Sequence, residues 1–68
     1  MRALTPRQCE IVTYIRQRIE HGPAPTLREI GDHFKIASLN GVRCHLRALK
    51  QKGRIDWQPG KARTLVLV

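Results

Sequence analysis

Hydrophobic residues recur at three- and four-residue spacing in three stretches of the chain, and this period predicts three amphipathic helices. The helices are expected at about residues 6–21, 27–35 and 39–52. In the first helix, Cys9 is placed close to the apolar face. The three apolar stripes consist of Ile11, Val12, Ile15 and Ile19; Leu27, Ile30 and Phe34; and Val42, Leu46 and Leu49.

Each predicted helix begins after a residue that can cap free backbone N–H groups. Thr5 is followed three residues later by Gln8, and Thr26 is followed three residues later by Glu29. This spacing is typical of a capping box, in which two side chains satisfy each other's backbone donors. Ser38 is the cap expected for the third helix. These signals support three separate helices joined by short connections.

The period changes after Gly53, which stands where a glycine commonly follows the last turn of a helix. Ile55 and Trp57 alternate with polar neighbours, and the last six residues are mostly apolar and rich in β-branched types. Alternation with a period of two predicts strands, and residues 59–62 are typical of a turn. The expected element is a β-hairpin over about residues 54–68, with the register of its second strand left open. Trp57 is expected to fill the core between the hairpin and the helices.

This order of elements predicts a mainly α fold with a small β-hairpin, namely a three-helix winged helix-turn-helix. The 68 residues are expected to form a single domain, 1–68. A domain of this size buries only about 60% of its unfolded surface, which leaves little room for an enclosed active site. Size therefore favours a binding module over an enzyme.

The predicted third helix has two different sides. At about 100° per residue, its core positions cluster within about 60°, and the opposite side is polar and basic. Arginine can bind guanine with two hydrogen bonds, asparagine can bind adenine in the same way, and a thiol can lie against a thymine methyl group. Each of these residues alone also fits an ordinary solvated helix, and Gly41 could either admit a DNA backbone or relieve crowding between helices. The candidates for reading bases are Ser38, Asn40, Gly41, Arg43, Cys44 and Arg47.

The net charge of +8 is concentrated in the second half of the chain, since residues 1–34 carry +1 and residues 35–68 carry +7. A one-sided excess suits a polyanion, because neutralising phosphates releases condensed counterions. A solvated basic face, a membrane surface and an acidic protein partner are the other interpretations that charge alone leaves open. The candidates for contacting the DNA backbone are Thr26, Arg28, Lys50, Lys52, Lys61 and Arg63.

Other chemistries find little support in the sequence. No run of apolar residues approaches the roughly 18 that a membrane-spanning helix needs, so no membrane partner is expected. The sequence shows no secretory signal, and we expect a cytoplasmic, nucleoid-associated domain. Cys9 and Cys44 are expected to be free thiols. The three histidines stand twelve residues apart, which matches no common ligand spacing, so no metal or other cofactor is expected. Ser38 is the only serine, and no base lies at a spacing that indicates catalysis.

Three motifs occur in an order and spacing that resemble the DNA-binding domain of the LexA family of SOS-response repressors. They read L-T-x-R-Q, P-T-x-x-E-I and H-L-x-A-L-x-x-K-G-x-I, and the resemblance spans essentially all 68 residues with one gap near Gly22. It implies a third helix in the major groove and repression of DNA-damage genes from promoter operators, with one domain on each half-site. It also implies base contacts by Ser38, Asn40, Gly41, Arg43 and Cys44.

The chain departs from the best-known pattern of that family at two positions. An acidic pair is typical where this chain has Arg43 and Cys44. Carboxylates accept hydrogen bonds from cytosine amino groups, whereas arginine prefers the acceptors of guanine. We therefore expect a different half-site, with a guanine facing Arg43.

The self-cleaving half of the family, with its Ser–Lys dyad and dimer surface, is not found in these 68 residues. We therefore expect no protease activity. The domain is expected to be a monomer alone and a dimer on operator DNA or through a C-terminal domain. Two competing hypotheses remain at this point. One is a winged helix that binds an acidic protein partner, and the other is an RNA-binding or architectural domain without base specificity.

Overall fold

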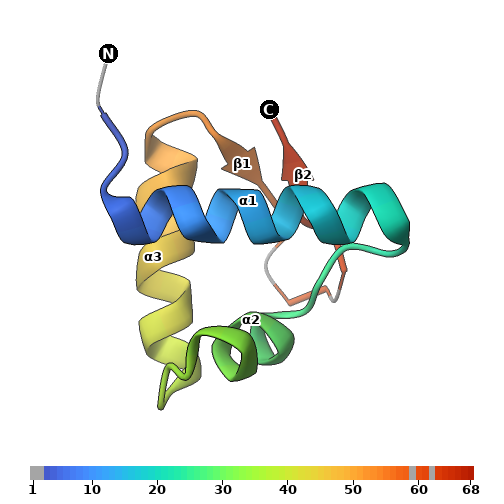
Figure 1. Cartoon of the computed structure of the whole chain (residues 1–68), viewed down its shortest axis with the longest axis horizontal. Helices are drawn as coiled ribbons and strands as arrows, with labels where there is room; N and C mark the ends of the chain where they lie inside the picture. Colours follow the sequence, from blue (N-terminus) through green and yellow to red (C-terminus); the bar gives the residue numbers. More distant parts are fainter. Residues whose placement is uncertain (1–2, 59, 62) are drawn as a thin grey trace.

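The computed structural model describes residues 3–58, 60–61 and 63–68. The long first helix crosses the third, the second lies near the start of the third, and the strands follow the end of the third helix (Figure 1). This arrangement confirms the predicted fold of three helices with a small antiparallel sheet. The elements are α1 (Pro6–His21), α2 (Leu27–Phe34), α3 (Leu39–Gln51), β1 (Ile55–Asp56) and β2 (Val66–Leu67).

Both predicted capping boxes are formed. The Gln8 N–H donates to Thr5 Oγ1 at 3.1 Å, and the Thr5 N–H donates to Gln8 Oε1 at 3.0 Å. Thr26 and Glu29 repeat the pattern at the start of α2, with distances of 2.9 and 3.1 Å. Each cap stabilises its helix by about 1 kcal/mol, and each fixes the residue at which the helix begins.

The turn between α2 and α3 is built on a left-handed residue. Lys35 has φ 56° and ψ 41°, so α2 ends at Phe34, one residue before the predicted end. The Ile36 N–H then donates to the Gly31 carbonyl at 2.9 Å. A left-handed residue other than glycine costs about 1–2 kcal/mol. The turn redirects the chain within four residues, and Ser38 then caps α3.

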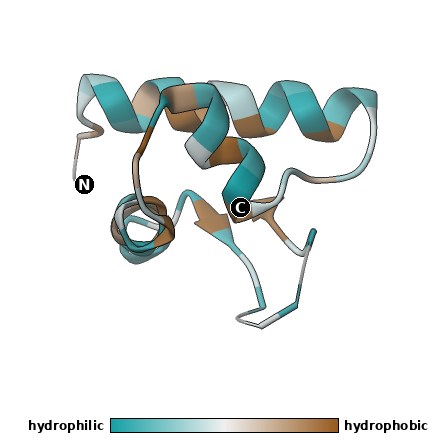
Figure 2. Cartoon of the chain, turned by 90° about the horizontal axis from the view of Figure 1, so that it is seen from below, coloured by the Kyte–Doolittle hydropathy of each residue, from teal (hydrophilic) through white to brown (hydrophobic). Residues whose placement is uncertain are grey.

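The core lies where α3 meets α1, α2 and the hairpin. Along α1, hydrophobic positions recur between hydrophilic ones (Figure 2). The prediction that Cys9 lies close to this face is wrong, because Cys9 is exposed and Gln8 is buried instead. Gln8 precedes Ile11 by three residues and so shares its side of the helix, whereas Cys9 is rotated by about 100°. The buried apolar residues are Ile11, Val12, Ile15, Ile30, Val42, Leu46, Leu49, Ile55 and Leu65.

The hairpin, which we call the wing (residues 54–68), has much shorter strands than the sequence predicts. Its two strands pair antiparallel, with Ile55 opposite Leu67, which settles the register. Pairing stops early because side chains take the next backbone donors. The Trp57 N–H donates to its neighbour Asp56 at 2.8 Å, and the Gln58 N–H donates to Thr64 Oγ1 at 2.9 Å. The predicted turn at 59–62 includes Pro59 and Ala62, which lie outside the described residues.

Candidate nucleic-acid interface

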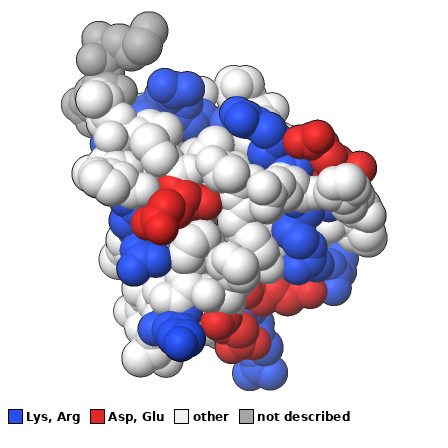
Figure 3. Space-filling view, viewed as in Figure 1, with Lys and Arg blue, Asp and Glu red and all other residues white. Residues whose placement is uncertain are grey.

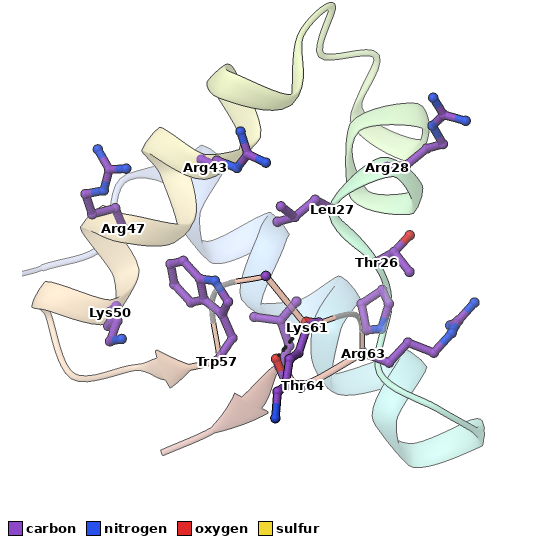
Figure 4. Close-up of a pocket in the computed structure, with 13 residues that line it drawn as sticks. Thr26, Leu27, Arg28, Arg43, Arg47, Lys50, Trp57, Lys61, Arg63 and Thr64 are labelled. Carbon is purple, nitrogen blue, oxygen red and sulfur yellow. Dashed lines mark hydrogen bonds between the residues drawn. The ribbon is translucent and has the colours of Figure 1, made fainter.

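A groove of about 680 Å³ runs between α3, the start of α2 and the wing. Side chains from the three elements converge on it, with arginines on the α2 and α3 sides and Trp57 beneath α3 (Figure 4). We call it the α3–wing groove. It is lined by Pro25, Thr26, Leu27 and Arg28; by Arg43, Arg47 and Lys50; and by Trp57, Gly60, Lys61, Arg63, Thr64 and Leu65.

The exposed side of α3 carries the residue types that were predicted to read bases. Asn40, Arg43, Cys44 and Arg47 are all exposed, because the core stripe of α3 is completely buried on the opposite side. Arg43 and Arg47 both line the α3–wing groove. Ser38 is also exposed, and its Oγ accepts a hydrogen bond from the Gly41 N–H at 3.1 Å.

Gly41 has a packing role within the protein. A Cβ atom at this position would lie 2.9 Å from the Ile36 Cγ2 methyl group, which is closer than real Cβ contacts allow. The glycine therefore lets the first turn of α3 pack against the connection from α2. This geometry supports the crowding interpretation of Gly41, and the glycine brings the exposed start of α3 close to α2.

Four cations around the α3–wing groove make no side-chain hydrogen bond or ion pair with any other residue that the structure describes. All four are exposed and line the groove from its three sides. In contrast, the face of the molecule seen in Figure 1 carries basic and acidic side chains side by side (Figure 3). The groove thus gathers four exposed positive charges that no described acidic side chain pairs. The four cations are Arg28, Arg43, Arg47 and Lys61.

Lys50 lines the same groove but is already paired. Its ammonium group lies 3.1 Å from Asp56 Oδ1 and 5.2 Å from the centre of the Trp57 ring. The hydrogen bond from Lys50, together with the Trp57 N–H, lowers the pKa of Asp56 below its usual value. A paired lysine has less charge to offer to a phosphate than the four unpaired cations.

Lys52 points away from the α3–wing groove. Its Nζ donates to the Ala3 carbonyl at 3.0 Å and to Gln8 Oε1 at 2.6 Å. It therefore ties the end of α3 to the capping box of α1. The structure does not bring Lys52 together with the other residues predicted to contact the DNA backbone.

Arg63 lies at the rim of the α3–wing groove, where its guanidinium group contacts the protein itself. Its Nη1 donates to the Ala24 carbonyl at 3.1 Å and to Glu29 Oε1 at 3.2 Å. The extended segment before α2 thus meets the wing through a side chain. The Thr26 N–H and Arg18 also bond to Glu29, and together they lower the pKa of its carboxyl group from 4.5 to about 2.

Six residues of the α3–wing groove were not among the predicted site residues, namely Pro25, Leu27, Trp57, Gly60, Thr64 and Leu65. Leu27 and Trp57 supply apolar and aromatic surface between the charged rims. Both are half-buried and pack against the core, which agrees with the core position expected for Trp57. A single tryptophan in the basic half of the chain was the available signal. Its periodicity indicates a core residue and gives no sign that one side faces a groove.

Other candidate sites are not formed within the part of the chain that the structure describes. Residues 3–58, 60–61 and 63–68 contain no group of three His, Cys, Asp or Glu side chains that could hold a metal ion. The two cysteines are free and exposed. Every helix in the same ranges is too short or too polar to cross a bilayer.

A helix-turn-helix followed by a wing, with uncompensated cations around its last helix, defines the winged helix-turn-helix class of DNA-binding domains. The model of the family described as the LexA DNA binding domain matches residues 1–64. The chain belongs to this family.

Whole proteins with similar sequences are LexA repressors. The one from Sorangium cellulosum (strain So ce56) is 53% identical over 66 residues, which cover 96% of this chain and 29% of that protein. The one from Anaeromyxobacter dehalogenans (strain 2CP-1) is 48% identical over 67 residues, with 97% and 29% covered. The one from Geotalea uraniireducens (strain Rf4) is 48% identical over 69 aligned positions, with 100% and 34% covered. The chain thus spans about a third of the length of these relatives.

Proposed function

We propose that this domain binds double-stranded DNA sequence-specifically, as the operator-reading part of a LexA-type transcriptional repressor. The observation that carries this proposal is the α3–wing groove, where four unpaired cations from α2, α3 and the wing surround one exposed helix face. A duplex presents a regular array of phosphates, and their neutralisation supplies most of the non-specific affinity. The same groove leaves the polar side of α3 accessible for base contacts.

In the proposed complex, α3 enters the major groove, which at about 12 Å is wide enough for a helix. Asn40, Arg43, Cys44 and Arg47 then face the base edges, with Arg43 opposite a guanine. The Ser38 oxygen accepts from Gly41 within the protein, so its hydroxyl hydrogen stays available for an acceptor on the DNA.

The phosphate contacts fall on both sides of α3. Arg28 lies in the first turn of α2, beside the cap Thr26, so helix-end amides and a guanidinium group face the same strand. Lys61 stands on the wing across the groove. Lys50 is already paired with Asp56, so it offers a phosphate less charge than the unpaired cations.

We further propose that two such domains occupy the two half-sites of an SOS-type operator, and that dimerisation uses parts of the protein beyond these 68 residues. A single domain then binds one half-site weakly, because linking two modules raises affinity through effective concentration. Sedimentation of the domain without DNA should give a monomer. A tight dimer under those conditions would contradict this part of the proposal.

The decisive experiment is the selection of bound sequences from a random duplex pool. Enrichment of a short motif is expected. The logarithm of the binding constant should also fall linearly with the logarithm of the salt concentration, with a slope of about −0.9 for each phosphate contact. Absence of any enriched motif would favour an architectural or RNA-binding role, and absence of duplex binding would favour an acidic protein partner.

The role of Arg43 needs a sharper test. Arg43→Ala should weaken binding to the selected half-site and remove discrimination at one base pair, which a panel of single-base variants would detect. Arg16→Ala is the matched control, because Arg16 is an exposed arginine of α1 outside the groove. Uniform weakening over the whole panel would make Arg43 a phosphate contact.

A further inference from the structure

The carboxylate of Glu29 connects three parts of the fold. Its Oε2 accepts from Arg18 Nη2 of α1 at 3.1 Å. Its Oε1 accepts from the Thr26 N–H at the start of α2 at 2.9 Å and from Arg63 Nη1 of the wing at 3.2 Å. A capping box needs only the bond to Thr26, so the other two contacts are additional to helix capping.

Arg63 is the part of the wing held by this carboxylate. It also donates to the Ala24 carbonyl at 3.1 Å, so one guanidinium nitrogen bridges the segment before α2 and the first turn of α2. The backbone of Arg63 has φ 60°, a left-handed conformation that is unfavourable for residues other than glycine. Contacts to Glu29 and Ala24 offset that cost and favour this position of the wing.

The consequence concerns Lys61, which precedes Arg63 by two residues. Lys61 is exposed and lines the α3–wing groove together with Arg28 of α2. The distance between these two cations depends on where the wing sits relative to α2. Among the described residues, the side-chain hydrogen bonds that link the wing to α2 and to the segment before it are those of Arg63.

We propose that Glu29 and Arg63 are a positioning pair, which holds the wing against α2 so that Lys61 and Arg28 contact DNA together. This inference rests on the proposed DNA binding and assigns Arg63 a role different from direct phosphate contact. Arg63 increases the affinity for DNA by holding Lys61 in position. Glu29 increases it in the same way, although its negative charge by itself repels the phosphates of DNA.

The sign of the Glu29 effect separates this model from simple electrostatics. Glu29→Gln removes one negative charge from a domain of net charge +8, so charge alone predicts tighter DNA binding. Glutamine retains an amide oxygen that can accept from the Thr26 N–H, as glutamine does in other capping boxes. The positioning pair is nevertheless weakened, and we expect affinity for duplex DNA to fall by about three- to tenfold, which lies in the lower part of the range of coupling between contacting residues.

A double-mutant cycle tests whether Arg63 acts through Lys61. Lys61→Ala and Arg63→Ala should each lower affinity for a short duplex by about three- to tenfold, and the double variant should lose little more than either single variant. The salt slope should fall by about 0.9 in all three variants, because a single phosphate contact is lost. Arg16→Ala serves as the charge-matched control, and thermal melts of each variant verify that it is folded.

Independent contributions would overturn the proposal. They would appear as multiplied affinity losses and a slope change of about 1.8 in the double variant. Tighter DNA binding by the Glu29→Gln variant would also overturn the proposal.

The wing position can also be measured without DNA, which separates this inference from the proposed function. In amide correlation spectra, Glu29→Gln should shift the signals of Gly60 and Lys61 in the free protein. If these wing signals stay unchanged, the pair does not position the wing, whatever the domain binds.

Discussion

Arg47, in the second half of α3, and Lys52, which directly follows the helix, should respond to mutation in different ways. Arg47 is exposed and unpaired on the α3–wing groove, whereas Lys52 bonds to Ala3 and Gln8 on the far side of the helix. Both were predicted from sequence to touch DNA. The structure predicts that Arg47→Ala impairs DNA binding and that Lys52→Ala impairs stability.

The expected magnitudes follow from these contacts. A bidentate arginine–base contact is worth about 1–3 kcal/mol of discrimination, so Arg47→Ala should weaken half-site binding by about five- to 150-fold. Its stability should stay within about 0.5 kcal/mol of the parent, as for most surface substitutions. Lys52→Ala removes two hydrogen bonds from a partly exposed ammonium group, a loss of about 1 kcal/mol after solvent screening. That loss lowers Tm by about 4–8 °C in a domain of this size.

Fluorescence anisotropy with a labelled half-site duplex and thermal melting by circular dichroism measure both quantities on the same samples. The reasoning is refuted if Lys52→Ala lowers DNA affinity as much as Arg47→Ala while its Tm stays unchanged. It is equally refuted if Arg47→Ala binds the half-site with the affinity of the parent.

Three further predictions concern stability. Lys35→Gly should raise the free energy of unfolding by about 1 kcal/mol in urea titrations, because glycine adopts the left-handed conformation without the Cβ penalty; lower stability would contradict this. Leu46→Ala should lower the free energy of unfolding by about 2–5 kcal/mol, because Leu46 is fully buried. A domain of 68 residues has a total of roughly 3–10 kcal/mol. The control Leu46→Met should lower it by less than about 1.5 kcal/mol. Stability should also fall as pH drops from 4.5 to about 2, because the Thr26 N–H and Arg18 hold the pKa of Glu29 low in the folded state. The stabilisation is complete above the unfolded pKa and is lost as Glu29 is protonated, so acid titrations of Glu29→Gln should be flatter than those of the parent.

Features that depend on neighbours three or four residues apart could be predicted from the sequence. The capping boxes and the stripe of α3 are such features, and they were sufficient for the fold. The error at Cys9 arose within the same kind of pattern. The apolar residues of α1 favour Cys9 as a member of its buried face, whereas the buried residue in the first turn is the polar Gln8.

Local spacing could not predict whether each lysine or arginine is paired with another residue of the protein. Lys52 bonds to Ala3 across 49 residues and Arg63 bonds to Glu29 across 34 residues. A lysine or arginine in a basic stretch gives no local sign of whether a distant acceptor already occupies it. Similarly, the sequence predicts that Glu29 is part of a capping box, but it does not predict the contacts of Glu29 with Arg18 of α1 and Arg63 of the wing.

The position of Trp57 makes the domain its own optical reporter. It is the only tryptophan of the chain, it is half-buried, and one side lines the α3–wing groove beside Lys50 (Figure 4). Indole emission depends on local polarity and on nearby charges. Any duplex that covers the groove will therefore change the emission of the unlabelled protein, and every variant that retains Trp57 can be titrated without attaching a dye.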